Sequence, residues 1–155
     1  MIFGGSPNSR IFQRIRVKDG LSYGTSAGFS VPTKDDGGLF AGSAIAAPQN
    51  LPKVEAAFNE ELAKALKDGF TADEVEKAKK TWLDQSSGRS EEAYMASLLV
   101  SRERWGRTMD WDAKLEAAVA ALSPQQVNEA FRRHVDPAAL NIVKAGDFNK
   151  AGVSH

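Results

Sequence analysis

Two side chains that can bind a polar group lie close together near the start of the chain. Arg16 ends a predicted helix and Tyr23 begins a predicted strand seven residues later, with Gly20 between them to permit a turn. The turn is expected to bring the two polar tips into one neighbourhood. A guanidinium donates two parallel hydrogen bonds, and a phenol is a neutral donor at pH 7. The two residues can form part of a site, but a complete catalytic site needs further groups.

The chain is poor in residues that ligate metals or act as nucleophiles. It has no cysteine, which excludes disulfides, thiol catalysis and cysteine-bound zinc, and it has only two histidines. His134 lies in a predicted helix end, where charge and helix dipole suit each other. His155 is the last residue, and is either native or part of a tag. No zinc-peptidase motif with paired histidines occurs, so no metal site is expected in this chain.

Three other patterns have plain structural explanations. Gly4–Ser6 lacks the preceding strand and the following lysine of a phosphate-binding loop. Asp35–Gly37 lacks the ligand spacing of a calcium loop, and a turn suffices. A stripe of aromatic residues is more typical of helix core than of a ligand site; it comprises Trp82, Tyr94, Trp105 and Trp111.

Length and charge favour a single domain over residues 1–155. The 20 basic and 20 acidic residues balance and are mixed along the chain, which argues against nucleic acid as a partner. No apolar run reaches the roughly 18 residues of a membrane-spanning helix, and no secretory signal stands at Met1. The composition is compatible with bacterial periplasm or cytoplasm, and the compartment stays open.

The first predicted helix, residues 9–18, carries three arginines. Arg10 and Arg14 are expected to face water, opposite the apolar side of the helix. Arg16 flanks that apolar side, one turn after Phe12. An arginine there can lay its stem on the core and direct its head at a partner.

An antiparallel hairpin is predicted from residues 22–31 and 39–47, with a turn between them. Strict alternation in the first strand puts Tyr23 and Phe29 on one face and small residues on the other. Tyr23 is therefore expected to lie half in the core.

The rest of the chain is predicted to be mainly helical. Thr71 with Glu74, and Ser123 with Gln126, form capping boxes that start helices. Further helices are predicted over 51–68, 91–105 and 111–122, and a final strand over 139–145.

This order of elements predicts an α+β fold, an antiparallel sheet with helices packed on one face. Three strands are few for this many helices, so a strand before Met1 is expected. Residues 1–3 read either as the last turn of a helix ended by glycine or as a short apolar tail.

The chain also resembles a known family over nearly its whole length. Its start closely resembles the C-terminal half of M16 zinc peptidases, the inverzincins, which include mitochondrial processing peptidase and pitrilysin. The matching segments are Gly4–Ser6, Ser9–Arg16 and Gly20–Tyr23, with weaker likeness over Phe70–Lys79, Val127–Val135 and Asn141–Asp147. The resemblance implies one half of the M16 fold, beginning inside that half.

The resemblance also implies roles for the two polar residues. In the family the N-terminal half binds zinc and the C-terminal half closes over the peptide. Arg16 and Tyr23 match an arginine and a tyrosine that reach the substrate near the scissile bond. Tyr23 would donate to the carbonyl oxygen as negative charge develops there.

The zinc-binding half has no counterpart in these residues, so the chain alone is not expected to hydrolyse peptides. The resemblance implies zinc only in the complete enzyme, with the N-terminal half or a catalytic subunit and a peptide as partners. The alternatives are a non-catalytic structural subunit of such a complex, or an unrelated α+β binding module.

Overall fold

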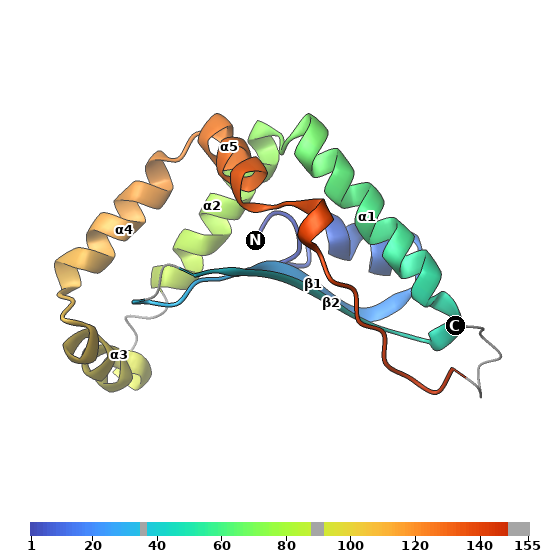
Figure 1. Ribbon diagram of the computed structural model, residues 1–155. Helices are drawn as coiled ribbons and strands as arrows, with labels where there is room; N and C mark the ends of the chain where they lie inside the picture. The colour runs from blue at the N-terminus through green and yellow to red at the C-terminus, as the bar shows by residue number, and fades with distance from the viewer. Residues whose placement is uncertain (35–36, 88–91, 149–155) are drawn as a thin grey trace. The chain divides into compact units, whose positions relative to one another are not determined.

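The computed structural model describes residues 1–34, 37–87 and 92–148 (Figure 1). Over these residues an antiparallel hairpin is combined with helices, so the α+β class is confirmed. None of the described helices is long and apolar enough to span a membrane. In chain order the elements are η1 (Phe12–Lys18), β1 (Ser22–Ser30), β2 (Leu39–Ala46), η2 (Pro48–Asn50), α1 (Leu51–Asp68), α2 (Ala72–Ser87), α3 (Glu92–Trp105), α4 (Met109–Ala121), α5 (Pro124–His134) and η4 (Pro137–Ala139).

Contacts divide the chain into two compact units. The first comprises Met1–Phe70 and Asn128–His155, and the second comprises Thr71–Val127. The boundary crosses α5, whose first turn belongs to the second unit. The hairpin, η1 and α1 all lie in the first unit, so this unit carries the residues that the sequence singles out.

The hairpin forms as the sequence predicts. β1 pairs antiparallel with β2, from Ser30 opposite Leu39 to Ser22 opposite Ala46. Asp35 and Asp36, for which the sequence analysis preferred a turn to a calcium loop, lie outside the described residues.

The two faces of the hairpin differ in character. On one face Phe29 and Phe40 lie opposite each other, with ring centroids 5.0 Å apart. On the other face the hydroxyls of Ser26 and Ser43 meet at 3.1 Å. The aromatic face packs on the rest of the first unit, since Phe40 lies 5.9 Å from Phe3 and 6.1 Å from Phe131, centroid to centroid.

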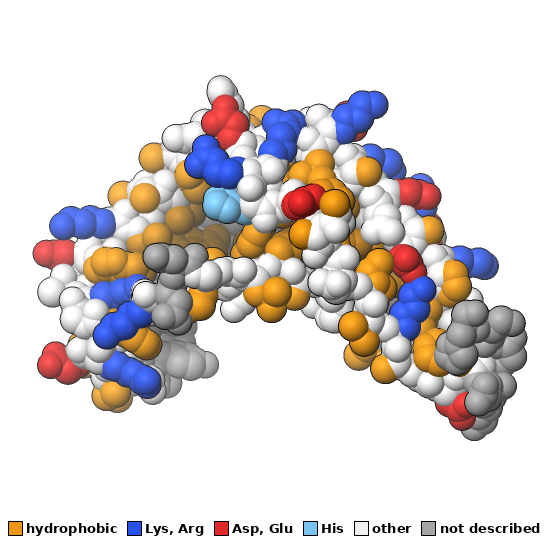
Figure 2. Space-filling model, viewed as in Figure 1, with side chains coloured by type: hydrophobic (Ala, Val, Ile, Leu, Met, Phe, Trp, Pro, Cys, Tyr) orange, Lys and Arg blue, Asp and Glu red, His pale blue; other side chains and the backbone are white. Residues whose placement is uncertain are grey.

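A cluster of phenylalanine rings forms the core of this unit. Phe131 of α5 has its ring centroid 5.6 Å from that of Phe3 and 5.0 Å from that of Phe70. Phe3 also meets Phe58 of α1 at 5.7 Å, edge to face. In Figure 2 hydrophobic side chains gather along the space between α1 and the hairpin. The rings join four chain segments that are far apart in sequence.

Residues 1–3 form a turn that places Phe3 in this core. Phe3 is only 5% exposed, so the segment is not a loose tail, and it is not helical. Gly4 forms an isolated bridge with Ala27 of β1, and a Cβ on Gly4 would stand 2.3 Å from the Ala27 nitrogen. Gly4 therefore serves close backbone packing.

The end of α1 is tied to α5 by one amide side chain. Gly69 ends α1 with φ 78°, a conformation that favours glycine. The Asn128 side chain accepts from the Phe70 backbone N–H at 2.6 Å and donates to the Phe70 carbonyl oxygen at 3.0 Å. Because Phe70 is buried, these bonds satisfy groups that water does not reach.

The helices of the second unit begin as the sequence predicts. The Thr71 N–H donates to the Glu74 carboxylate at 2.8 Å, and the Glu74 N–H donates to the Thr71 hydroxyl at 3.2 Å. Ser123 and Gln126 make the same reciprocal pair at the start of α5. Both capping boxes are confirmed.

The aromatic stripe of the second unit is only partly buried. Trp111 is 36% exposed, and the guanidinium carbons of Arg107 and Arg102 lie 3.9 and 5.4 Å from its ring centroid. Two guanidinium groups thus lie over this ring, where the sequence suggested helix core. The side chain of Tyr94 lies outside the described residues.

The predicted strand over 139–145 is wrong. After η4 the described chain runs on without joining the two-stranded sheet. Ile142 and Val143 favour a strand, but they are 53% and 88% exposed and have no strand beside them. A strand needs a neighbour for its backbone groups, which the local pattern does not supply.

We expect Asn128→Ala to lower the free energy of unfolding by about 2 kcal/mol, since the Phe70 N–H loses its partner in a buried place. Chemical denaturation followed by circular dichroism measures this. The control is Asn59→Ala, at an exposed position of α1. Equal effects of the two substitutions would contradict the bridging role of Asn128.

Candidate functional site

Arg16 lies in a π-helix that ends at a glycine turn. In η1 the Asp19 N–H donates to the Arg14 carbonyl oxygen at 3.0 Å, five residues back. Gly20 follows with φ 61°, which a side chain would strain. The chain thus leaves the helix and enters β1 within a few residues. The predicted helix is confirmed, but its π geometry was not foreseen.

Arg16 and Tyr23 do meet. The guanidinium carbon of Arg16 lies 4.7 Å from the Tyr23 ring centroid and 5.1 Å from that of Phe12. The cation is thus in contact range of two aromatic rings, which orient it without consuming its hydrogen-bond donors. The expectation that the two residues share one neighbourhood is confirmed. Phe12 is the third residue of this cluster, and the sequence analysis noted it only as a neighbour of Arg16 on the helix.

A β-bulge turns Tyr23 out of the sheet. Ser22 pairs with Ala46 and Gly24 pairs with Ile45, so Tyr23 is an extra residue in β1. Tyr23 is 81% exposed, whereas Ser22 is 6% exposed. The expectation that Tyr23 lies half in the core is therefore wrong. It assumed strict alternation over residues 22–31, and the bulge interrupts this alternation at Tyr23.

Ser22 holds the bulge from within. Its hydroxyl lies 2.7 Å from the Gly24 carbonyl oxygen and 2.8 Å from the Ile45 carbonyl oxygen, and it can donate to either. One of these acceptors is on β1 and the other on β2. The buried hydroxyl thus stabilises carbonyl groups that the irregular pairing leaves beside it. A serine directly before the tyrosine was the only sequence signal for it.

The other two arginines of this segment are structural. The Arg10 guanidinium donates to the Gly69 carbonyl oxygen at 2.7 Å and lies 5.0 Å from the Phe70 ring centroid. Arg14 pairs with Asp19 at 2.7 Å and with Glu60 at 2.9 Å. The expectation that both face water is wrong, because acceptors from α1 and its end come within reach.

The charges around Arg14 and Arg16 agree with a structural role for Arg14 and a different role for Arg16. The hydrogen bond to Asp19, followed by the charges of Asp19 and Glu60, raises the pKa of Arg14 above its ordinary value. Among the described residues, no carboxylate pairs with Arg16. Arg16 is thus the arginine of this segment whose donors face outward.

The described residues hold no metal centre. They contain no group of three or more histidine, aspartate or glutamate side chains placed to bind an ion. His134 is exposed in the last turn of α5, and His155 lies outside the described residues. This part of the chain does not fit zinc.

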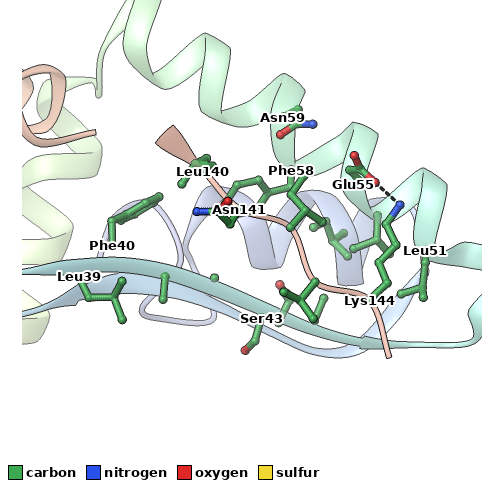
Figure 3. Close-up of a pocket in the computed structure, with 18 of the residues that line it drawn as sticks. Leu39, Phe40, Ser43, Leu51, Glu55, Phe58, Asn59, Leu140, Asn141 and Lys144 are labelled. Atoms are coloured by element: carbon green, nitrogen blue, oxygen red, sulfur yellow. Dashed lines mark ion pairs between the residues drawn. The ribbon is translucent and has the colours of Figure 1, made fainter. Parts of the chain in front are cut away.

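One apolar pocket lies in the first unit, between β2, α1 and the segment after η4 (Figure 3). Its volume is about 480 Å³. Lys144 and Glu55 form an ion pair at 2.5 Å on its wall. Sequence analysis did not identify this pocket, since one of its walls, residues 139–144, lies far from β2 and α1 along the chain.

Removing the Ser22 hydroxyl should weaken the contact between the Tyr23 ring and the Arg16 guanidinium. In Ser22→Ala, the ring-current shifts that Tyr23 imposes on the Arg16 side chain should shrink in the NMR spectrum. Ser26→Ala, at an exposed serine of the same strand, should leave them unchanged. Unchanged shifts in both variants would rule out the bulge as the device that places Tyr23.

Substitution of Arg14 should lower the stability of the fold more than substitution of Arg16. Arg14→Gln should move the urea unfolding midpoint to lower concentration, because Asp19 and Glu60 lose their partner. Arg16→Gln should change stability by less than about 0.5 kcal/mol, as is typical of exposed positions. A larger loss for Arg16→Gln than for Arg14→Gln would make Arg16 structural.

Comparisons with known proteins agree with this fold. A family model described as the peptidase M16 inactive domain matches residues 1–81. No curated protein gives a significant match. Two solved structures resemble the chain in fold, and each is about three times as long as the part that it shares with the chain.

The first solved structure is a peptidase M16 inactive domain from Pseudomonas fluorescens. It is 22% identical, with a TM-score of 0.73, and the match covers 87% of this chain and 32% of that one. The second is a conserved protein from Enterococcus faecalis V583, 22% identical, with a TM-score of 0.66, covering 85% and 30%. Since the family model covers more than half of the 155 residues, the chain belongs to the peptidase M16 inactive-domain family.

Proposed function

We propose that the chain is the substrate-closing part of an M16 zinc metallopeptidase. In this role Arg16 and Tyr23 contact the peptide near the bond to be cut. The zinc is bound by another part of the enzyme, either on the same polypeptide or on a catalytic partner, since the residues described here contain no cluster of three or more candidate ligands.

The observation that carries the proposal is the exposed pair of Arg16 and Tyr23. The guanidinium stands over the Tyr23 ring at 4.7 Å, and both side chains reach solvent. A purely structural tyrosine would gain by burying its ring, yet Tyr23 is 81% exposed on a bulge. Bulges often redirect a side chain toward a site, which supports a role in binding.

The chemistry of the two groups suits a peptide bond under attack. Negative charge develops on the carbonyl oxygen, and a phenol O–H can donate to it without the cost of burying a charge. The Tyr23 ring and the Phe12 ring orient the guanidinium, whose free donors can hold a neighbouring carbonyl or a carboxylate. Arg16 therefore positions the peptide, and Tyr23 polarises the bond.

The second candidate is a non-catalytic subunit that serves assembly within an M16-type complex. It is supported by the match to a family model whose description is an inactive domain. The exposed Arg16–Tyr23 pair favours the first candidate, since assembly alone gives no reason to keep a phenol hydroxyl free. The two candidates differ in whether that hydroxyl affects turnover.

In the assembled enzyme, Tyr23→Phe should lower kcat for peptide hydrolysis by about 10²–10³-fold, because one donor to the developing oxyanion is lost. Steady-state kinetics with a fluorogenic peptide measure this, and the zinc content should be unchanged. The 155-residue chain mixed with zinc alone should give no hydrolysis.

Arg16→Lys with Lys18→Arg provides a matched comparison on the same helix. Arg16→Lys should raise KM, since a single ammonium replaces a two-donor fork, whereas Lys18→Arg should have no effect. Full activity of Tyr23→Phe would refute the catalytic role and leave the assembly role.

A further inference from the structure

Ser22 is a polar residue at a position where an apolar residue would cost less. It begins β1 and is 6% exposed. A buried hydroxyl gives up its hydrogen bonds to water, so its burial costs free energy unless protein groups replace them. Alanine would occupy the same place without that cost. The hydroxyl therefore needs a role that packing alone does not give.

The Ser22 hydroxyl bridges the two strands at the bulge. Its oxygen lies 2.7 Å from the Gly24 carbonyl oxygen and 2.8 Å from the Ile45 carbonyl oxygen. Gly24 directly follows Tyr23 in β1, and Ile45 is the residue of β2 that pairs with Gly24. The hydroxyl thus links the residue before Tyr23 to the first regular pair after it, and the extra residue is enclosed between the two.

The backbone before Tyr23 is tied to the helix that carries Arg16. The Leu21 N–H donates to the Ile15 carbonyl oxygen at 2.9 Å, and Ile15 is only 1% exposed. Arg16 is the next residue of η1. With this bond on one side and the Ser22 bridge on the other, the backbone of Tyr23 is fixed relative to Arg16.

This frame matters because burial does not hold the Tyr23 side chain. The side chain is 81% exposed, and the Arg16 guanidinium lies against its ring. A catalytic donor must stand within roughly 0.5 Å of its productive place, and a shift of about 1 Å can cost about 10²-fold in rate. An exposed phenol reaches this precision only if its backbone is fixed.

We propose that Ser22 is a positioning residue for the Tyr23 hydroxyl in peptide hydrolysis. The inference rests on the proposed catalytic role of Tyr23. In this role Ser22 touches no substrate, and it acts by holding the bulge that presents the phenol. Loss of the serine hydroxyl displaces the donor and does not remove it. Such a change lowers kcat and leaves KM unchanged, because the interaction is made in the transition state.

The test is steady-state hydrolysis of a fluorogenic peptide by the assembled enzyme. Ser22→Thr and Ser22→Val give side chains of nearly the same shape that differ in the hydroxyl. Ser22→Thr should stay within about twofold of the native kcat, whereas Ser22→Val should lose about tenfold, less than Tyr23→Phe. Ser22→Ala should match Ser22→Val without added bulk. Ser26→Ala, at an exposed serine of β1, is the control and should keep the native kcat. Thermal unfolding establishes that each variant is folded.

A double-mutant cycle separates positioning from a general effect on the fold. In Tyr23→Phe the phenol hydroxyl is already absent, so adding Ser22→Ala should lower kcat no further. An equal fall with and without that hydroxyl would overturn the inference, since Ser22 would then act on the fold as a whole. Native kcat in Ser22→Ala, beside a large loss in Tyr23→Phe, would overturn it and leave the proposed function intact. Full activity of Tyr23→Phe would overturn the proposed function, and this inference with it.

Discussion

The first unit depends on the packing of Phe131 against rings from three other parts of the chain. Phe3, Phe40 and Phe70 all lie within about 6 Å of it, centroid to centroid. Aromatic pairs at such distances add stability beyond the area that they bury. A two-stranded hairpin is marginal by itself in water. The ring cluster therefore decides whether the hairpin, α1 and α5 form a unit at all.

The candidate site follows from this packing. Phe3 draws the N-terminal segment into the core, and Gly4 then pairs with Ala27 of β1. This leaves η1 and β1 joined by a short glycine turn, with Arg16 at the end of one and Tyr23 at the start of the other. The exposed pair is thus held by a buried framework, which is the arrangement that a contact of fixed geometry requires.

Local signals in the sequence predicted local features correctly. The capping residues Thr71 and Ser123 start their helices, and the spacing of Arg16 and Tyr23 brought them together. Features that depend on distant partners were missed. Arg10 and Arg14 were placed in water because Gly69 and Glu60, which they contact, lie more than forty residues away along the chain, and because the closer partner of Arg14, Asp19, is reached only through the turn after η1. The expectation that Tyr23 lies half in the core failed for a related reason. Alternation within one strand carries no information on its register with the neighbouring strand, so the bulge could not be predicted. The segment 139–145 has strand-forming residues but no neighbouring strand, which propensity cannot reveal.

The central claim is that the exposed face of Tyr23 meets the peptide. Photocrosslinking tests it most directly, with a benzophenone amino acid placed at position 23 of the assembled enzyme and a labelled peptide substrate. The control places the same group at position 31, where Val31 is 70% exposed in the same part of the chain. Crosslinks to the peptide from position 23, and none from position 31, are the predicted result. Absence of crosslinks from position 23, under conditions in which the enzyme binds the peptide, would contradict the account.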